Sequence, residues 1–217
     1  MLKYVVKKVS EINNETLKRS FFCMNKERRA KVKGHKNVLK KKCTLVGEWL
    51  VREMLSESTE KEPEFFIISA DEKGKLHSEN TPWLHFNISH SDDTVAAVVC
   101  DCQVGIDIET IRKVSLSLAK RVCNEGELVY IFEKLPSEDD FRSEDKDFIK
   151  RFLEIWTIKE AYFKCIGTGI TNFKAVNALS EDFKKIKITE DNYIMHMVMQ
   201  SKPTVEPPTF SNPYKKG

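Results

Sequence analysis

The segment 104–109, which reads VGIDIE, constrains the fold of this chain more than any other stretch. Isoleucines and acids alternate after its glycine, which predicts a short strand, and side chains two positions apart on a strand point to the same face. Asp107 and Glu109 therefore lie side by side, while Ile106 and Ile108 face a core. Two neighbouring carboxylates repel each other unless water or a cation lies between them. The pattern fits an amphipathic edge strand with solvated acids, or a site for a hard cation such as Mg²⁺.

The composition describes a folded protein of one large domain or two small ones. Of the 217 residues, 41% are hydrophobic and 32% are charged, and the net charge is only +3, which by itself does not argue for a nucleic-acid partner. The six cysteines form no CxxC pair. The first residues lack the apolar run of a signal peptide, and no stretch is apolar enough to span a membrane. We therefore expect reduced thiols, no membrane contact and a cytoplasmic location.

A basic run occupies residues 26–42, where nine Lys or Arg residues and His35 stand against a single acid, Glu27. Such a run is either a solvated helix face or a phosphate-binding patch, for nucleic acid or for a phosphorylated small molecule. No aromatic residue is interleaved among the charges, so stacked bases would have no platform. We therefore expect no nucleic-acid partner.

The periodicity predicts several further elements. Strands are expected at 4–6, 65–69, 83–88, 95–100, 185–189 and 193–199, and helices at 13–24, 45–55, 115–122, 125–132 and 148–165. Residues 137–147 read as a charged loop. A hairpin from Val95 to Glu109 would bring Ser89 and His90 close to Asp107; His90 is then either a structural histidine or a phosphate contact.

The helix expected at 148–165 places Trp156, Glu160 and Lys164 four residues apart and hence on one face. Glu160 and Lys164 are either a surface ion pair worth about 0.2–0.5 kcal/mol, or a third carboxylate and a cation that face the acidic strand. Gly167 is a natural end for this helix.

Together these motifs resemble the 4′-phosphopantetheinyl transferase family of the surfactin-synthetase-activating (Sfp-like) type. The resemblance covers about residues 1–200. Its motifs are Gly74-Lys75, FNISHS at 86–91, VGIDIE at 104–109 and WTIKEAYFK at 156–164, with weaker matches at 44–47 and 114–121. The acidic strand and the WTIKEAYFK helix at this separation make a specific signal, whereas either one alone would be weak.

The resemblance implies a mixed α/β (α+β) fold in which two similar α/β subdomains form an intramolecular pseudo-dimer. The expected subdomains are 1–102 and 103–200, followed by an extended tail at 201–217 that holds four of the seven prolines. Family members often end in a further apolar strand, which is missing here and leaves a sheet edge in doubt. Coenzyme A is expected in the cleft between the halves of a monomer.

The reaction that the resemblance implies is transfer of 4′-phosphopantetheine from coenzyme A to a serine of an apo acyl or peptidyl carrier protein, with release of 3′,5′-ADP. This is the activity of a holo-[acyl-carrier-protein] synthase. Mg²⁺, or Mn²⁺, is expected on Asp107, Glu109 and Glu160. Glu160 is the candidate base, although a metal-bound water or another carboxylate is an alternative, and Lys164 meets the developing charge. Matching positions imply coenzyme A contacts at Arg28 (where lysine is usual), Lys31, Thr44, Lys75, Ser89, His90, Lys159 and Lys164.

The carrier protein is expected to be acidic, so a basic and apolar surface would suit its docking. The candidates are Arg112, Lys113, Leu116, Lys120 and Arg121, although a solvated basic helix explains them equally well. Two other functions fit the same motifs. One is a non-catalytic module that binds coenzyme A or a carrier protein, and the other is a Mg²⁺-dependent phosphohydrolase that uses water as the nucleophile.

Overall fold

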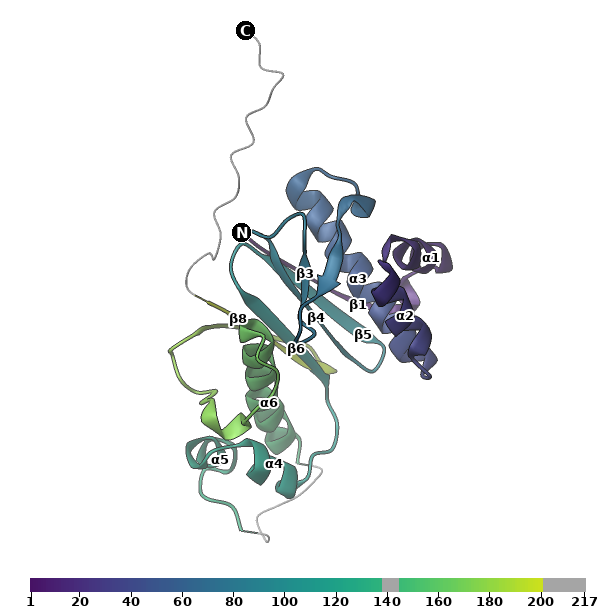
Figure 1. The fold of residues 1–217 in the computed structure, drawn as a ribbon. Helices are drawn as coiled ribbons and strands as arrows, with labels where there is room; N and C mark the ends of the chain where they lie inside the picture. The colour runs from purple at the N-terminus through teal and green to yellow at the C-terminus, as the bar shows by residue number, and fades with distance from the viewer. Residues whose placement is uncertain (138–144, 201–217) are drawn as a thin grey trace.

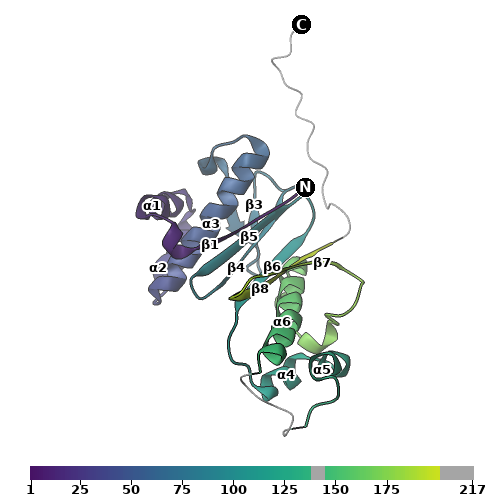
Figure 2. The ribbon, with the colours of Figure 1, turned by 180° about the vertical axis from the view of Figure 1, so that it is seen from behind.

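The computed structural model describes residues 1–137 and 145–200, and it shows the expected mixed α/β fold (Figures 1 and 2). The predicted tail at 201–217 and part of the predicted loop at 137–147 lie outside these residues. The strands are β1 Leu2–Lys8, β2 Ile68–Ala70, β3 Leu76–Ser78, β4 His85–Ser91, β5 Thr94–Cys100, β6 Val104–Thr110, β7 Lys184–Thr189 and β8 Tyr193–Met199. The helices are α1 Asn14–Cys23, α2 Lys26–Gly34, α3 Val38–Thr59, α4 Leu116–Val122, α5 Glu125–Phe132 and α6 Lys146–Ile166.

The N-terminal half is built on an antiparallel sheet in the order β1-β5-β4, with the helices α1 to α3 on one side (Figure 1). One face of β5 carries Val95, Ala97 and Val99, which share a core with the apolar residues of α3. The small hairpin of β2 and β3 lies beside this core. Ile68 is fully buried, but the predicted strand at 65–69 begins only there because Pro63–Phe65 forms a 3₁₀ turn.

The C-terminal half is built on a second antiparallel sheet, in the order β6-β8-β7, against which α6 packs. The predicted hairpin from Val95 to Glu109 is therefore wrong, because β6 pairs with β8 and not with β5. Both edges of β5 are already taken, one by β1 and the other by β4. The turn 101–103 thus carries the chain from one sheet to the other.

The two sheets pack on each other through the faces that point away from their helices. Ala96 and Val98 of β5 share a buried cluster with Ile106 and Ile108 of β6 and with three methionines of β8. The methionines are Met195, Met197 and Met199. The predicted alternation in the acidic strand is thereby confirmed, since its isoleucines enter this core.

Side chains of β4 replace backbone pairing along the edge of β6. Asn87, Ser89 and Ser91 lie two residues apart on one face of β4, and their oxygens accept hydrogen bonds from backbone amides of β6. The donors are the amides of Ile106 (3.1 Å), Ile108 (3.4 Å) and Thr110 (3.0 Å). We call these three contacts the β4–β6 ladder. It holds the two halves in a fixed register and satisfies amides that an exposed edge would leave to water.

Gly105 lets α6 approach the acidic strand closely. A Cβ atom at this position would lie 2.0 Å from the carbonyl oxygen of Ala161 and 2.4 Å from the amide nitrogen of Cys165. The helix ends as predicted at Gly167, whose φ of 69° is the left-handed conformation that favours glycine.

We predict that Gly105→Ala destabilises the protein by about 3 kcal/mol, because the new methyl group would push rigid helix backbone away from β6. Urea unfolding measures the change. Gly34→Ala is the matched control: no atom lies within 4 Å of the new methyl group, and alanine favours the helix in which Gly34 lies. Equal midpoints for the two variants would contradict this account of the packing.

Candidate functional site

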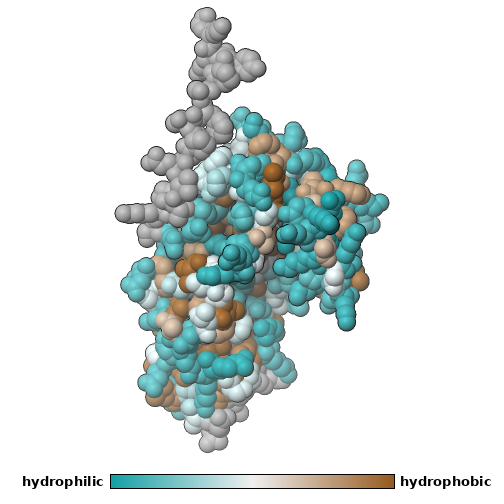
Figure 3. Space-filling model, viewed as in Figure 1, coloured by the Kyte–Doolittle hydropathy of each residue, from teal (hydrophilic) through white to brown (hydrophobic). Residues whose placement is uncertain are grey.

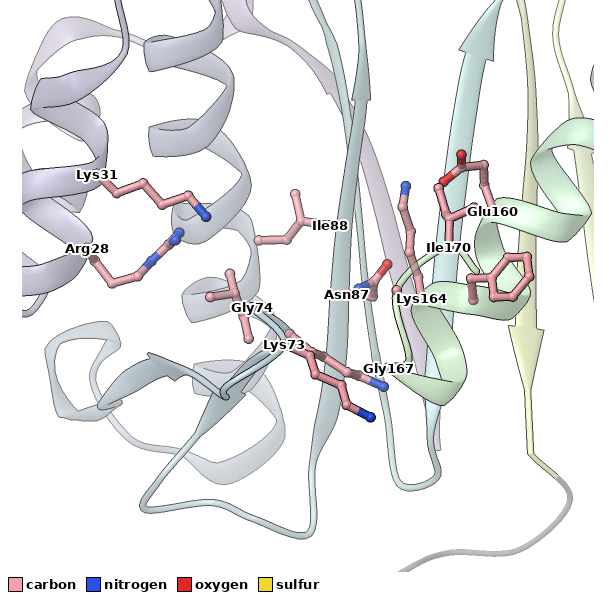
Figure 4. Close-up of a pocket in the computed structure, with 14 residues that line it drawn as sticks. Arg28, Lys31, Lys73, Gly74, Asn87, Ile88, Glu160, Lys164, Gly167 and Ile170 are labelled. Carbon is pink, nitrogen blue, oxygen red and sulfur yellow. The ribbon is translucent and has the colours of Figure 1, made fainter. Parts of the chain in front are cut away.

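A pocket of about 360 Å³ lies between the two halves and is lined by residues of both (Figure 4). The N-terminal half contributes side chains of α2, the β2–β3 turn and β4, and the C-terminal half contributes α6 and the loop after it. The lining residues are Arg28, Lys31, Lys73, Gly74, Lys75, Leu76, Asn87, Ile88, Glu160, Phe163, Lys164, Gly167, Gly169 and Ile170. Five cations against one carboxylate make this a site for an anion.

Asp107 of β6 lies next to the pocket, in contact with the lining residue Lys164. Its Oδ1 accepts hydrogen bonds from the Lys164 ammonium at 2.5 Å and from the Ser89 hydroxyl at 2.8 Å. Its Oδ2 is buried and has no hydrogen-bond partner among residues 1–137 and 145–200. Burial raises the pKa of Asp107, although the positive charge of Lys164 opposes that shift. A buried carboxylate oxygen without a donor is a position for a cation.

Glu160 and Glu109 are the other two predicted carboxylates. Burial, reinforced by the negative charge of Asp107, raises the pKa of Glu160 to about 7. The Glu109 carboxylate accepts hydrogen bonds from the Ser91 hydroxyl at 3.1 Å and from Arg112 Nε at 3.4 Å. The structure thus brings the three acids close enough to interact, and the negative charge of Glu109 adds to the upward shift of the pKa of both Asp107 and Glu160.

These acids suit Mg²⁺ or Mn²⁺ chemically, because they supply oxygen ligands and one of the oxygens lacks a donor. They do not yet surround a common point. In the described part of the chain, Cys100, Asp101 and Cys102 alone form a group of three potential ligands whose atoms all lie within 4.8 Å of one another. Lys164 pairs with Asp107 at 2.5 Å and offsets part of its negative charge.

The opposite wall of the pocket is cationic. Arg28 and Lys31 come from α2 and point toward the pocket (Figure 4). Lys75 lies between the halves: its ammonium donates to Gln103 Oε1 at 2.7 Å and to the carbonyl oxygen of Cys165. Burial lowers the pKa of Lys75.

Three predicted coenzyme A contacts, Ser89 and His90 of β4 and Thr44 of α3, do not share one face of β4. Ser89 faces Asp107, whereas His90, the next residue, points to the opposite face. Burial lowers the pKa of His90, and the charges of Lys164 and Lys40 lower it further. The Thr44 hydroxyl donates to the carbonyl oxygen of Lys40 at 2.9 Å and lies 3.4 Å from His35 Nε2. Neither His90 nor Thr44 lines the pocket, but both lie among basic residues close to it.

Lys159 does not reach the pocket. Its ammonium is fully buried in the core of the C-terminal half, where it donates to Glu127 at 2.6 Å and to the carbonyl oxygens of Val122 and Phe173. Successive helix residues point about 100° apart, so Lys159 and Glu160 face different surroundings although they are adjacent in sequence. The prediction of a coenzyme A contact at Lys159 is corrected accordingly.

The predicted docking surface loses one member. Leu116 is only 4% exposed and packs inward from α4, so it does not lie on a surface that a partner could contact. Arg112, Lys113 and Arg121 are exposed and Lys120 is half-buried. Arg112 also contacts Glu109, which connects this basic surface to the acidic strand.

Several residues that the structure brings to the site were not predicted from the sequence as site residues. Lys73 lines the pocket from a turn, where a lysine carries no recognisable signal. Asn87 both lines the pocket and forms part of the β4–β6 ladder. The period-two spacing of Asn87, Ser89 and Ser91 could have indicated the ladder, since it places three short polar side chains on one face of a strand.

On the face shown in Figure 3, hydrophilic residues cover most of the surface and hydrophobic ones are scattered among them. No helix within residues 1–137 or 145–200 combines the length and the apolar character that crossing a membrane requires.

Comparisons with known proteins point to one family. Residues 103–203 match the model of the 4′-phosphopantetheinyl transferase superfamily. The chain is 34% identical over 67% of its length to the 4′-phosphopantetheinyl transferase psf-1 of Bacillus pumilus, of which the match covers 58%. It is 33% identical over 58% of its length to gsp of Aneurinibacillus migulanus (49% covered), and 33% identical over 59% of its length to Sfp of Bacillus subtilis (53% covered).

The aligned region thus spans about half the length of these relatives. The segment that matches the superfamily model contains the acidic strand and α6. The resemblance is thereby confirmed: this chain is similar to Sfp-like 4′-phosphopantetheinyl transferases.

Proposed function

We propose that this protein transfers the 4′-phosphopantetheine group of coenzyme A to a serine hydroxyl of an apo acyl or peptidyl carrier protein. One observation carries the proposal. Glu160, an acid with a raised pKa, and a row of cations line one pocket between the two halves, and the buried Asp107, whose pKa is also raised, contacts the lining residue Lys164. A pyrophosphate that reacts at a metal needs both of these walls.

Asp107, Glu109 and Glu160 would hold Mg²⁺, or Mn²⁺ in its place. The bound cation would supply electrostatic stabilisation of the pyrophosphate charge. The buried Oδ2 of Asp107 and the raised pKa of Glu160 support this assignment. Arg28, Lys31 and Lys75 would bind coenzyme A phosphates, with Thr44 and His90 close to them.

In the proposed reaction, the serine oxygen forms a bond to phosphorus, the bond from that phosphorus to the 3′,5′-ADP oxygen breaks, and 3′,5′-ADP leaves. The serine proton goes to Glu160, directly or through a water molecule. A carboxylate whose pKa is about 7 suits this role because a substantial fraction is ionised at neutral pH and that fraction accepts a proton readily. Lys164 would stabilise charge on the phosphoryl oxygens.

The proposal includes the organisation of the chain. Each half has a sheet with one face against its own helix and the other face against the opposite sheet. We infer an intramolecular pseudo-dimer of subdomains 1–102 and 103–200, active as a monomer in the cytoplasm, with the reaction at its internal boundary.

The decisive experiment is intact-mass spectrometry of an apo acyl carrier protein incubated with this protein, coenzyme A and Mg²⁺. We expect the carrier to gain the mass of one phosphopantetheine, and EDTA to prevent the gain. If coenzyme A binds but several unrelated carriers gain no mass, the binding-module function is favoured. If 3′,5′-ADP appears without an acceptor, the protein is a phosphohydrolase.

Asp107→Asn and Glu160→Gln are each predicted to abolish transfer in this assay and to leave the melting temperature equal to or above that of the wild type. Burial raises the pKa of both acids, so keeping them charged at neutral pH opposes folding, and neutral amides remove that cost. Calorimetry and the mass assay together test this. Near-normal turnover in either variant would remove our site assignment.

The rate is predicted to depend on pH through Glu160. Below a pH of about 7 this carboxyl becomes protonated and neither accepts the serine proton nor binds a cation, so kcat/KM should fall as the pH decreases. Mg²⁺ would favour the ionised form of Glu160. Raising the Mg²⁺ concentration should therefore move the decrease in kcat/KM to lower pH. A profile that is flat between pH 5 and 8 at limiting Mg²⁺ would argue against Glu160 as the base.

Carrier docking is tested by Arg121→Glu, which places an acid on the exposed basic surface of α4. We expect the KM for an acidic carrier to rise about tenfold, since like charges now face each other, while the KM for coenzyme A stays unchanged. Lys18→Glu, on the exposed face of α1, is the matched charge reversal. Equal effects of the two variants would show that only the net charge matters.

A further inference from the structure

A buried cluster of three charged residues lies behind the cationic wall of the pocket. Glu48 of α3 accepts from Arg28 of α2 on one oxygen and from Arg52 on the other, and all of these contacts measure 3.0 Å. Glu48 and Arg52 are completely buried, and Arg28 is only 6% exposed. Packing alone does not explain the cluster, because apolar residues of similar volume would fill the same space without the free-energy cost of burying charges.

Arg52 is fixed independently of the pocket. Its guanidinium donates to the backbone carbonyl oxygens of Cys23, Pro63 and Phe66 at 2.8–3.0 Å, in addition to Glu48. Glu48 therefore lies between two arginines, each of which is always charged, so the cluster of three residues has an excess of positive charge. Arg52 neutralises Glu48, and the remaining positive charge belongs to Arg28, the member that lines the pocket.

The geometry of Arg28 shows how that charge is directed. Both contacts with Glu48 use the Nε–Nη2 edge of the guanidinium. Within residues 1–137 and 145–200 Nη1 makes no hydrogen bond, and Arg28 lines the pocket, so the Nη1 donors remain for a ligand. Because guanidinium is planar, fixing one edge fixes the direction of the other. A lysine, the usual residue at this position according to the family resemblance, has one nitrogen and cannot hold Glu48 through one edge while presenting another.

We propose that Glu48 is a positioning residue for coenzyme A: it holds the guanidinium of Arg28 in the orientation that meets a phosphate in the pocket. The proposal rests on the proposed function, because it takes the anion in the pocket to be coenzyme A. Glu48 itself does not touch the ligand. It acts through Arg28, and Arg52 holds the buried carboxylate in place.

A double-mutant cycle tests this proposal. The dissociation constant of coenzyme A is measured by calorimetry in EDTA, so that binding is followed without transfer, for the wild type, Arg28→Met, Glu48→Gln and the double variant. We expect each single variant to weaken binding about tenfold, the range of a lost hydrogen bond to a charged group. The double variant should bind no more weakly than Arg28→Met, because Glu48 acts only through Arg28. Lys36→Met, which removes an exposed cation from the same basic run, is the control for charge.

A purely structural role for Glu48 predicts a different result. Glu48→Gln would then weaken binding further in the Arg28→Met background, or would lower the melting temperature without changing the dissociation constant, and either outcome overturns the proposal. Arg28→Lys keeps both the charge and Glu48, so it addresses orientation even if Glu48→Gln fails to fold. We expect weaker binding than in the wild type, and equal binding would overturn the proposal.

The experiments distinguish failure of the proposed transferase activity from failure of the role proposed for Glu48. If the wild type binds coenzyme A and modifies no carrier, the transferase activity is wrong while the cycle can still be measured. If the wild type does not bind coenzyme A, the role of Glu48 falls with it.

Discussion

The β4–β6 ladder determines how the two halves of this molecule meet. Three short polar side chains of one strand bond to backbone amides of another, so the halves are joined in register without forming a continuous sheet. Ser89 has a double role, because its hydroxyl also donates to Asp107. The distance between the acidic strand and the cationic wall therefore depends on the same contacts that hold the halves together.

At the interface between the two halves, close packing buries acidic side chains, which is unfavourable for their charged forms. Gly105 lets α6 pack closely on β6, and burial raises the pKa of Asp107 on the strand and of Glu160 on the helix. Lys164 compensates part of the cost through its contact with Asp107. Such a site is costly to fold in isolation, and a ligand that brings both positive and negative charge would relieve it.

Local patterns in the sequence predicted what local physics decides. Alternation placed Ile106 and Ile108 in a core, and the four-residue spacing of Glu160 and Lys164 placed both on the pocket face of α6. Strand pairing was mispredicted because a free sheet edge is a property of the whole fold: the run 95–100 shows no sign that β1 and β4 already occupy both edges of β5. Lys159 was misassigned because adjacency along a helix is not adjacency in space, and its partner Glu127 lies 32 residues away.

The interface between the sheets has a composition that bears on its tolerance to substitution. Met195, Met197 and Met199 occupy alternate positions on one face of β8 and share a buried cluster with isoleucines of their own sheet and with Ala96 and Val98 of the opposite sheet. Methionine is unbranched and has three rotatable bonds, so it refills a changed gap at little cost, unlike a β-branched side chain. This layer should therefore tolerate substitutions that alter its volume better than a layer of β-branched side chains would.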